Sequence, residues 1–284
     1  MVLGHEYSAQ VVEVGPGVSG FAVGDHVTVD PNIYCGCCDP CQNGKKQLCQ
    51  HMEAIGVTRD GGFAQYSLIP ASQAFKLDPT VSFEAAAMAE PLACCIHGID
   101  LAGIRPGQKV CVVGGGAIGL IMVQLAKLSG AAKILLSEPN QKRREAGLAL
   151  GADVAIDPTQ PGWEAAFSQE MGEGAHVVIE CVGNVPAVKS AFQFAAKGAT
   201  ILLFSVPKVG STFELPLFDV YKKELTIKGS FVNPDTHARA VELINHGKVD
   251  FGPIITHRFT LDQLPQAIAM QMSDESIKVV VEAE

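Results

Sequence analysis

Apolar and polar residues alternate in short runs through the first 94 residues of the chain. Runs of this kind, bounded by Gly, Pro and Asp, predict β-strands. We expect four such strands, interrupted by one cysteine-rich loop, at Ala9–Val14, His26–Val29, Ala64–Ile69 and Ala74–Leu77. The pattern therefore predicts a barrel-like β domain.

The pattern changes after Glu90-Pro91, where apolar runs of strand length alternate regularly with helical segments. In one helical segment, for example, Ile118, Met122 and Leu125 share a face. Strands that alternate with crossover helices predict the α/β class, with a doubly wound parallel sheet. The six predicted strands lie near residues 109–114, 133–138, 154–157, 176–181, 199–205 and 225–231.

The regular alternation stops at Pro234. A helical stretch, Ala238–Asn245, is followed by two extended segments, Ile254–Phe259 and Ile277–Val281. We expect these segments to return to the first domain, which is then built from two pieces. The predicted domains are residues 1–94 with 235–284, and residues 95–234.

Composition and charge exclude several classes of partner. The 284 residues are 48% hydrophobic and 18% charged, which is typical of a globular chain of about two domains. The net charge of −9, without any run of Lys or Arg, does not suit phosphate backbones or anionic membranes. The sequence starts without an export signal and has no apolar run of about 18 residues. These features predict a cytoplasmic protein that binds neither nucleic acid nor membrane.

A glycine-rich turn follows the first of the six strands. The sequence after Val113 has the form G-x-G-x-x-G, with Gly114, Gly116 and Gly119 at the three glycine positions. In this context Gly114 permits a tight turn, Gly116 lets the backbone approach a pyrophosphate, and Gly119 lets helix and strand pack closely. The helix N-terminus supplies free N–H groups for phosphate oxygens. The motif predicts a dinucleotide-binding site.

An acidic residue, Glu138, ends the second strand of this domain, where a carboxylate accepts hydrogen bonds from a ribose diol. Because Glu138 would repel a 2′-phosphate, we expect NAD to be preferred over NADP. Lys142, Arg143 and Arg144 follow closely. An arginine there could pack on adenine or tolerate a phosphate, and an equally good interpretation is exposed helix surface.

Four cysteines, Cys35, Cys38, Cys41 and Cys49, lie in one loop with the spacing C-x2-C-x2-C-x7-C. Four thiolates from so short a segment suit closed, tetrahedral zinc that stabilises the loop. A zinc ribbon that binds nucleic acid is another interpretation, which the acidic charge disfavours. We interpret Cys37 as a bystander. The cysteines in apolar runs are interpreted as small buried hydrophobic residues, namely Cys94, Cys95, Cys111 and Cys181.

The order of the motifs resembles that of the zinc-containing medium-chain alcohol and polyol dehydrogenases. Gly4-His5-Glu6 comes first, then the four-cysteine loop, then Glu90-Pro91-Leu92, and finally the glycine turn. The sequence is most similar to the sorbitol-like and L-threonine dehydrogenase branches, and Ser137-Glu138-Pro139 with Arg143 resembles the cofactor strand of the latter. The resemblance implies a Rossmann domain at 95–234 and a GroES-like catalytic domain at 1–94 and 235–284.

The resemblance also implies a reaction and its residues. His5, Glu6 and Glu90 would hold a catalytic zinc, in addition to the structural zinc of the cysteines. The expected reaction moves a hydride from a secondary alcohol, either a polyol or a hydroxy-amino acid, to NAD. A homo-dimer or tetramer is expected by analogy. The cofactor-lining positions would be Ile118, Arg143, Ser205, Val206 and Phe231, together with the glycine turn and Glu138.

The start of the chain departs from the family pattern. Family members carry an upstream segment with further barrel strands and a cysteine ligand, so we expect the first domain to be incomplete and turnover of alcohols to be slow. The alternative is a catalytically silent protein that keeps zinc and NAD as a scaffold. A zinc-independent reductase is disfavoured by the joint presence of His5, Glu6, Glu90 and the cysteines. The apolar run Phe213–Leu217 could pair across a dimer or form an internal edge strand.

Overall fold

The structure is a computed structural model that describes residues 1–283. The chain divides into two compact units, one formed by residues 1–96 and 232–284 and the other by residues 97–231. Within the described residues, no helix has the length and apolar character that crossing a membrane requires.

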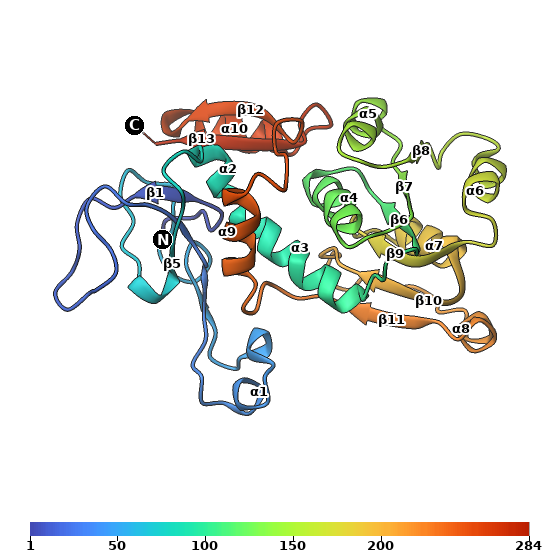
Figure 1. Cartoon of the computed structure of the whole chain (residues 1–284), viewed down its shortest axis with the longest axis horizontal. Coiled ribbons are helices and arrows are strands. Elements are labelled where there is room, and N and C mark those ends of the chain that lie inside the picture. Colours follow the sequence, from blue (N-terminus) through green and yellow to red (C-terminus); the bar gives the residue numbers. More distant parts are fainter. Residues whose placement is uncertain (284) are drawn as a thin grey trace. The chain divides into compact units, whose positions relative to one another are not determined.

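The unit of residues 97–231 contains one six-stranded sheet (Figure 1). The strand order is β11-β10-β9-β6-β7-β8, and every neighbouring pair is parallel. This confirms the predicted doubly wound sheet, in which β6 lies at the switch point of the strand order. The strands are β6 (Lys109–Val113), β7 (Lys133–Ser137), β8 (Val154–Ile156), β9 (Ala175–Glu180), β10 (Ala195–Leu203) and β11 (Thr226–Gly229).

Helices connect these strands and cover the sheet. In α4, Met122 and Leu125 are buried and Ile118 is half-buried, so the predicted apolar face packs inward. A second core cluster contains Phe194 and Phe167, whose ring centroids lie 4.6 Å apart. The helices are α4 (Ala117–Leu128), α5 (Gln141–Ala149), α6 (Trp163–Met171), α7 (Val185–Phe194) and α8 (Leu217–Lys223), and α3 (Ala89–Ala102) enters from the preceding unit.

The segment Phe213–Leu217 is not a strand, contrary to one of the sequence interpretations. Phe213 packs its ring 5.1 Å from that of Phe192, and α8 begins at Leu217 directly after Pro216. The backbone ladder of β10 is instead completed by β11. The apolar run therefore reflects one partly buried ring and the start of a helix.

The unit of residues 1–96 and 232–284 contains three small sheets. The largest is antiparallel, in the order β1-β2-β5, with β1 at Ser8–Gln10, β2 at His26–Val29 and β5 at Ala74–Lys76. The other two pair β3 (Asn32–Ile33) with β4 (Glu53–Ala54), and β12 (Ile255–Thr260) with β13 (Lys278–Glu282). The helices are α1 (Asp39–Gln42), α2 (Phe83–Ala87), α9 (His237–Asn245) and α10 (Leu264–Gln271), and short 3-10 turns lie at Lys46–Leu48, Ala71–Gln73 and Leu261–Gln263.

The prediction of a strand at Ala64–Ile69 is wrong. This stretch lies outside every strand, and Tyr66 and Leu68 expose 75% and 97% of their surface. Alternation predicts a strand only where one face packs and a neighbouring strand supplies hydrogen bonds. The strand predicted at Ala9–Val14 is also shorter than expected, although Val11 N–H still donates to Asp25 C=O at 2.8 Å.

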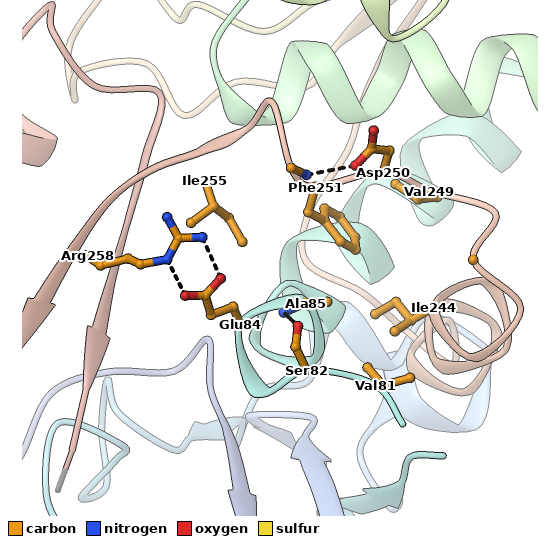
Figure 2. A pocket seen from close by; sticks show the side chains of 12 residues that line it. Val81, Ser82, Glu84, Ala85, Ile244, Val249, Asp250, Phe251, Ile255 and Arg258 are labelled. Carbon is orange, nitrogen blue, oxygen red and sulfur yellow. Dashed lines mark hydrogen bonds and ion pairs between the residues drawn. The ribbon is translucent and has the colours of Figure 1, made fainter. Parts of the chain in front are cut away.

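A surface groove of about 310 Å³ lies in the same unit, beside α2 and the segment after α9 (Figure 2). Its wall includes Phe251 and Ile255, and Arg258 pairs with both carboxylate oxygens of Glu84. None of the candidate site residues lines this groove.

The chain re-enters this unit through residues 232–235, which buried polar groups hold in place. Asn32 Nδ2 donates to Asn233 Oδ1 at 2.5 Å, and Asn233 Nδ2 donates to Asp30 Oδ1 at 3.3 Å. Val232 has a φ of 46°, a costly conformation for a β-branched residue. The neighbouring hydrogen bonds therefore hold a strained segment.

Candidate functional site

The four predicted cysteines come together. The Sγ atoms of Cys35, Cys38, Cys41 and Cys49 all lie within 4.8 Å of one another, and Cys37 is exposed outside the group. Figure 1 shows the segment around α1 extending away from β1 and β5 of its own unit. The spacing of Cys38 Sγ and Cys49 Sγ is 3.9 Å. Tetrahedral zinc with Zn–S bonds of about 2.3 Å requires sulfur atoms about 3.8 Å apart, so the four cysteines fit such an ion.

Backbone N–H groups donate to several of these sulfur atoms. The amides of Cys35 and His51 both donate to Cys49 Sγ at 3.4 Å. Hydrogen bonds from the amides of Cys37 and Cys38 lower the pKa of Cys35 to about 6. Donors of this kind favour the thiolate, which is the form that binds zinc.

His5, Glu6 and Glu90 form a second group, with ligand atoms within 4.8 Å of one another. His5 and Glu6 precede β1, whereas Glu90 lies in the first turn of α3. Close backbone packing fixes the first two. A Cβ atom on Gly56 would lie 2.1 Å from Gly4 C=O, and one on Gly61 would lie 2.2 Å from it. Both positions therefore need glycine, because a side chain at either would collide with the backbone that precedes His5.

The charges in this group are poised for a cation. Lys278 Nζ, on β13, pairs with Glu6. Burial raises the pKa of Glu6, but Lys278 outweighs burial and the net pKa is lowered. Burial and the charge of Glu6 raise the pKa of Glu90 to about 8. Lys278 thus balances the charge of Glu6, whereas Glu90 retains a proton that a bound metal ion would displace.

Cys94 contacts a member of this group, although we predicted it to be a small buried hydrophobic residue. Its Sγ lies one helical turn after Glu90 on α3 and donates to Glu90 Oε1 at 3.3 Å. The i, i+4 spacing is the sequence signal that could have indicated this contact. Cys95 and Cys111 are fully buried, which confirms the prediction for those two.

The glycine turn joins β6 to α4. Gly114 has a φ of 100°, and a Cβ atom on Gly119 would lie 1.8 Å from Gly114 C=O. These two positions therefore need glycine for the turn itself. A Cβ atom on Gly116 would meet nothing within 4 Å, so Gly116 borders open space at the start of α4. That arrangement fits the approach of a pyrophosphate.

Glu138 is only 5% exposed and accepts two backbone hydrogen bonds. Gly115 N–H donates to its Oε2 at 2.6 Å, and Asn140 N–H donates to its Oε1 at 2.8 Å. The carboxylate thus fixes the glycine turn through Gly115. Its oxygens keep further lone pairs that can accept hydrogen bonds from ribose hydroxyls. Arg144 donates to the C=O groups of Glu138 and Pro139, so it is not simply solvated helix surface.

The other predicted cofactor residues follow the carboxyl ends of strands. Ile118 follows β6, Ser205 and Val206 follow β10, and Phe231 follows β11. Ile118 and Ser205 are half-buried, while Val206 and Phe231 are 95% and 52% exposed. In a parallel sheet these ends share one edge, which is where ligands of such folds bind.

Glu180, at the end of β9, was not predicted as a site residue from the sequence. It is fully buried, its Oε1 accepts from the amides of Val182 and Gly183 at 2.7 and 2.8 Å, and Ser205 Oγ donates to its Oε2. An apolar strand ending in Glu does carry a sequence signal, because a buried acid at a strand end needs nearby donors.

Comparisons with known proteins agree with this geometry. Residues 117–246 match the zinc-binding dehydrogenase family, and residues 1–79 match the alcohol dehydrogenase GroES-like domain. A sorbitol dehydrogenase of Halalkalibacterium halodurans is 36% identical over 99% of this chain and 83% of that protein. An L-threonine 3-dehydrogenase of Paraburkholderia phytofirmans is 33% identical over 99% of this chain and 82% of that protein.

A solved structure agrees as well. A zinc-binding dehydrogenase of Sinorhizobium meliloti, bound to NADP, is 40% identical, covers 98% of this chain and 82% of its own, and superposes with a TM-score of 0.93. The fold, the two groups of candidate metal ligands and these relatives lead to one conclusion: the chain belongs to the zinc-containing medium-chain family of alcohol and polyol dehydrogenases.

Proposed function

We propose that the chain oxidises a secondary alcohol with zinc and a nicotinamide dinucleotide, and that His5, Glu6 and Glu90 hold the catalytic zinc. The observation that carries this proposal is the group of three ligand atoms within 4.8 Å, in a chain of this family. The substrate class that we propose is a polyol or a hydroxy-amino acid, since relatives are named for sorbitol and L-threonine.

Each residue of the two groups has a separate proposed role. When bound, zinc would supply Lewis acidity toward the alcohol oxygen and the nicotinamide would supply the hydride acceptor. His5 and the two carboxylates would hold the metal, and Lys278 would keep Glu6 charged. Cys94 would orient Glu90 through its S–H···O contact. The cysteine group would hold a second zinc with a structural role.

Glu138 supports a preference for NAD over NADP. Its carboxylate is buried beside the glycine turn, where the 2′-phosphate of NADP would meet a negative charge. Because the Sinorhizobium meliloti relative was solved with NADP, the preference needs a direct measurement. The cytoplasmic location and the homo-oligomeric state stay predictions.

The experiment is a combined measurement of metal content and turnover. We expect two zinc ions per chain after dialysis, and nicotinamide reduction with sorbitol, L-threonine or another secondary alcohol. His5→Ala should release one zinc ion and abolish turnover. Ala substitution of His246, an exposed histidine outside both groups of proposed metal ligands, is the matched control and should retain both zinc ions and turnover. One zinc ion per unaltered chain and no turnover with any alcohol would favour the scaffold alternative.

A further inference from the structure

Glu180 connects two loops at the carboxyl edge of the six-stranded sheet. Its side chain accepts from Val182 and Gly183, which directly follow β9. Its own C=O accepts from the amides of Phe204 and Ser205, which directly follow β10, at 3.0 and 3.2 Å. The two loops are therefore fixed to one buried residue.

These loops also pack against the glycine turn. A Cβ atom on Gly114 would lie 2.6 Å from Val182 Cγ2, and Cys181 N–H donates to Val113 C=O at 2.9 Å. A Cβ atom on Gly183 would lie 3.1 Å from Val206 C=O. Displacement of the 181–183 loop would therefore disturb the turn on one side and the 204–206 loop on the other.

The contact with Glu180 also fixes the direction of the Ser205 hydroxyl. Ser205 Oγ donates to Glu180 Oε2, so the hydroxyl hydrogen of Ser205 points toward that oxygen. The side chain of Ser205 is only partly buried. What it can offer to a ligand is its oxygen lone pairs, and these accept a hydrogen bond.

We propose that Glu180 is a positioning residue, which fixes Ser205 as a hydrogen-bond acceptor for an N–H or O–H group of the bound nicotinamide dinucleotide. This inference rests on the proposed function. The nicotinamide amide, the ribose hydroxyls and the adenine amino group are the donors that such a ligand carries. Glu138, at the end of β7 beside β6, accepts a hydrogen bond from the glycine turn at Gly115 but has no serine partner among residues 1–283. It is therefore the control position for Glu180.

Binding of three ligands to the purified chain tests the proposal. NAD carries both kinds of donor, acetylpyridine adenine dinucleotide lacks the amide N–H, and ADP-ribose lacks the nicotinamide altogether. Ser205→Ala should weaken NAD binding by about tenfold, the effect of one hydrogen bond. Ser205→Thr, which keeps the hydroxyl, should bind NAD with the affinity of the unaltered chain. A loss confined to NAD assigns the nicotinamide amide as the donor, and a loss shared with ADP-ribose assigns a ribose hydroxyl or the adenine amino group.

Glu180→Gln tests the positioning role. The side-chain amide of Gln can donate to Ser205 Oγ and so occupy the lone pairs that would accept from the ligand. The contribution of Ser205 to NAD binding should then be largely lost. In this background, Ser205→Ala should therefore cost far less than tenfold. Glu138→Gln should leave the effect of Ser205→Ala intact, and Glu173→Gln, at an exposed position of the same unit, should bind NAD as the unaltered chain does.

Two results would overturn the inference. One is unchanged binding of all three ligands by Ser205→Ala. The other is a full tenfold effect of Ser205→Ala in the Glu180→Gln background, which would show that Glu180 does not orient the serine. If the Gln variant does not fold, the Ala and Thr variants at position 205 still decide whether the hydroxyl accepts. If the unaltered chain binds no dinucleotide, the proposed function itself fails, which is a distinct outcome.

Discussion

His237 makes the stability of its unit depend on pH. This side chain is 1% exposed, neither ring nitrogen has a hydrogen-bond partner among residues 1–283, and its ring packs 4.8 Å from that of Phe75. Burial lowers the pKa of His237 from 6.5 to about 4. Below pH 6.5 the unfolded chain therefore binds a proton that the folded chain does not bind. Stability falls as the pH drops from 6.5 to 4, and between pH 7 and 4.5 the loss is about 2.5 kcal/mol.

Replacement of His237 by Leu should remove this loss. The free energy of unfolding of the variant, relative to the unaltered chain, should rise by about 2.5 kcal/mol between pH 7 and 4.5. Because acid also releases zinc, only this difference between the two proteins is informative. Urea unfolding followed by circular dichroism gives both values, and fluorescence of Trp163, the single tryptophan, identifies the transition of the 97–231 unit.

A second histidine provides the control for this experiment. His246 follows the same helix, α9, and its side chain is 66% exposed. The His246→Leu variant should lose stability in acid as the unaltered chain does. A difference between the His237→Leu variant and the unaltered chain that is equal at pH 7 and 4.5 would refute the reasoning.

Three further predictions concern the site. Replacement of Glu138 by Gln should weaken NAD binding by about one to two decades and narrow the discrimination against NADP, as calorimetry would show; equal affinities for NAD and NADP in the unaltered chain would contradict it. Cys38→Ser should remove one zinc ion and make residues 30–55 sensitive to protease, unlike Cys37→Ser. Cys94→Ala should weaken zinc binding at the Glu90 group on the order of tenfold, and Cys94→Ser should restore it if the contact is a hydrogen bond.

The sequence predicted best what depends on local pattern. The six parallel strands follow from apolar runs of the right length, and the glycine turn from a motif whose steric requirements are local. The stretch 64–69 failed because alternation does not reveal whether a neighbouring strand exists. Cys94 and Glu180 were missed for a similar reason. The partner of Glu180 is Ser205, which only the folded chain brings near. The partner of Cys94 is Glu90, but the apolar residues around Cys94 favoured its interpretation as a core residue.

The pairing of Lys278 with Glu6 links the two ends of the chain, 272 positions apart. The 97–231 unit is continuous and can fold during synthesis as soon as its own residues are available. The His5 group cannot be neutralised in this way until β13 has been made, because its lysine lies in that last strand. Assembly of the group of His5, Glu6 and Glu90 with its lysine partner is therefore a late event in biogenesis. A messenger truncated before Lys278 should yield a chain with a folded 97–231 unit and a Glu6 carboxylate without its lysine partner.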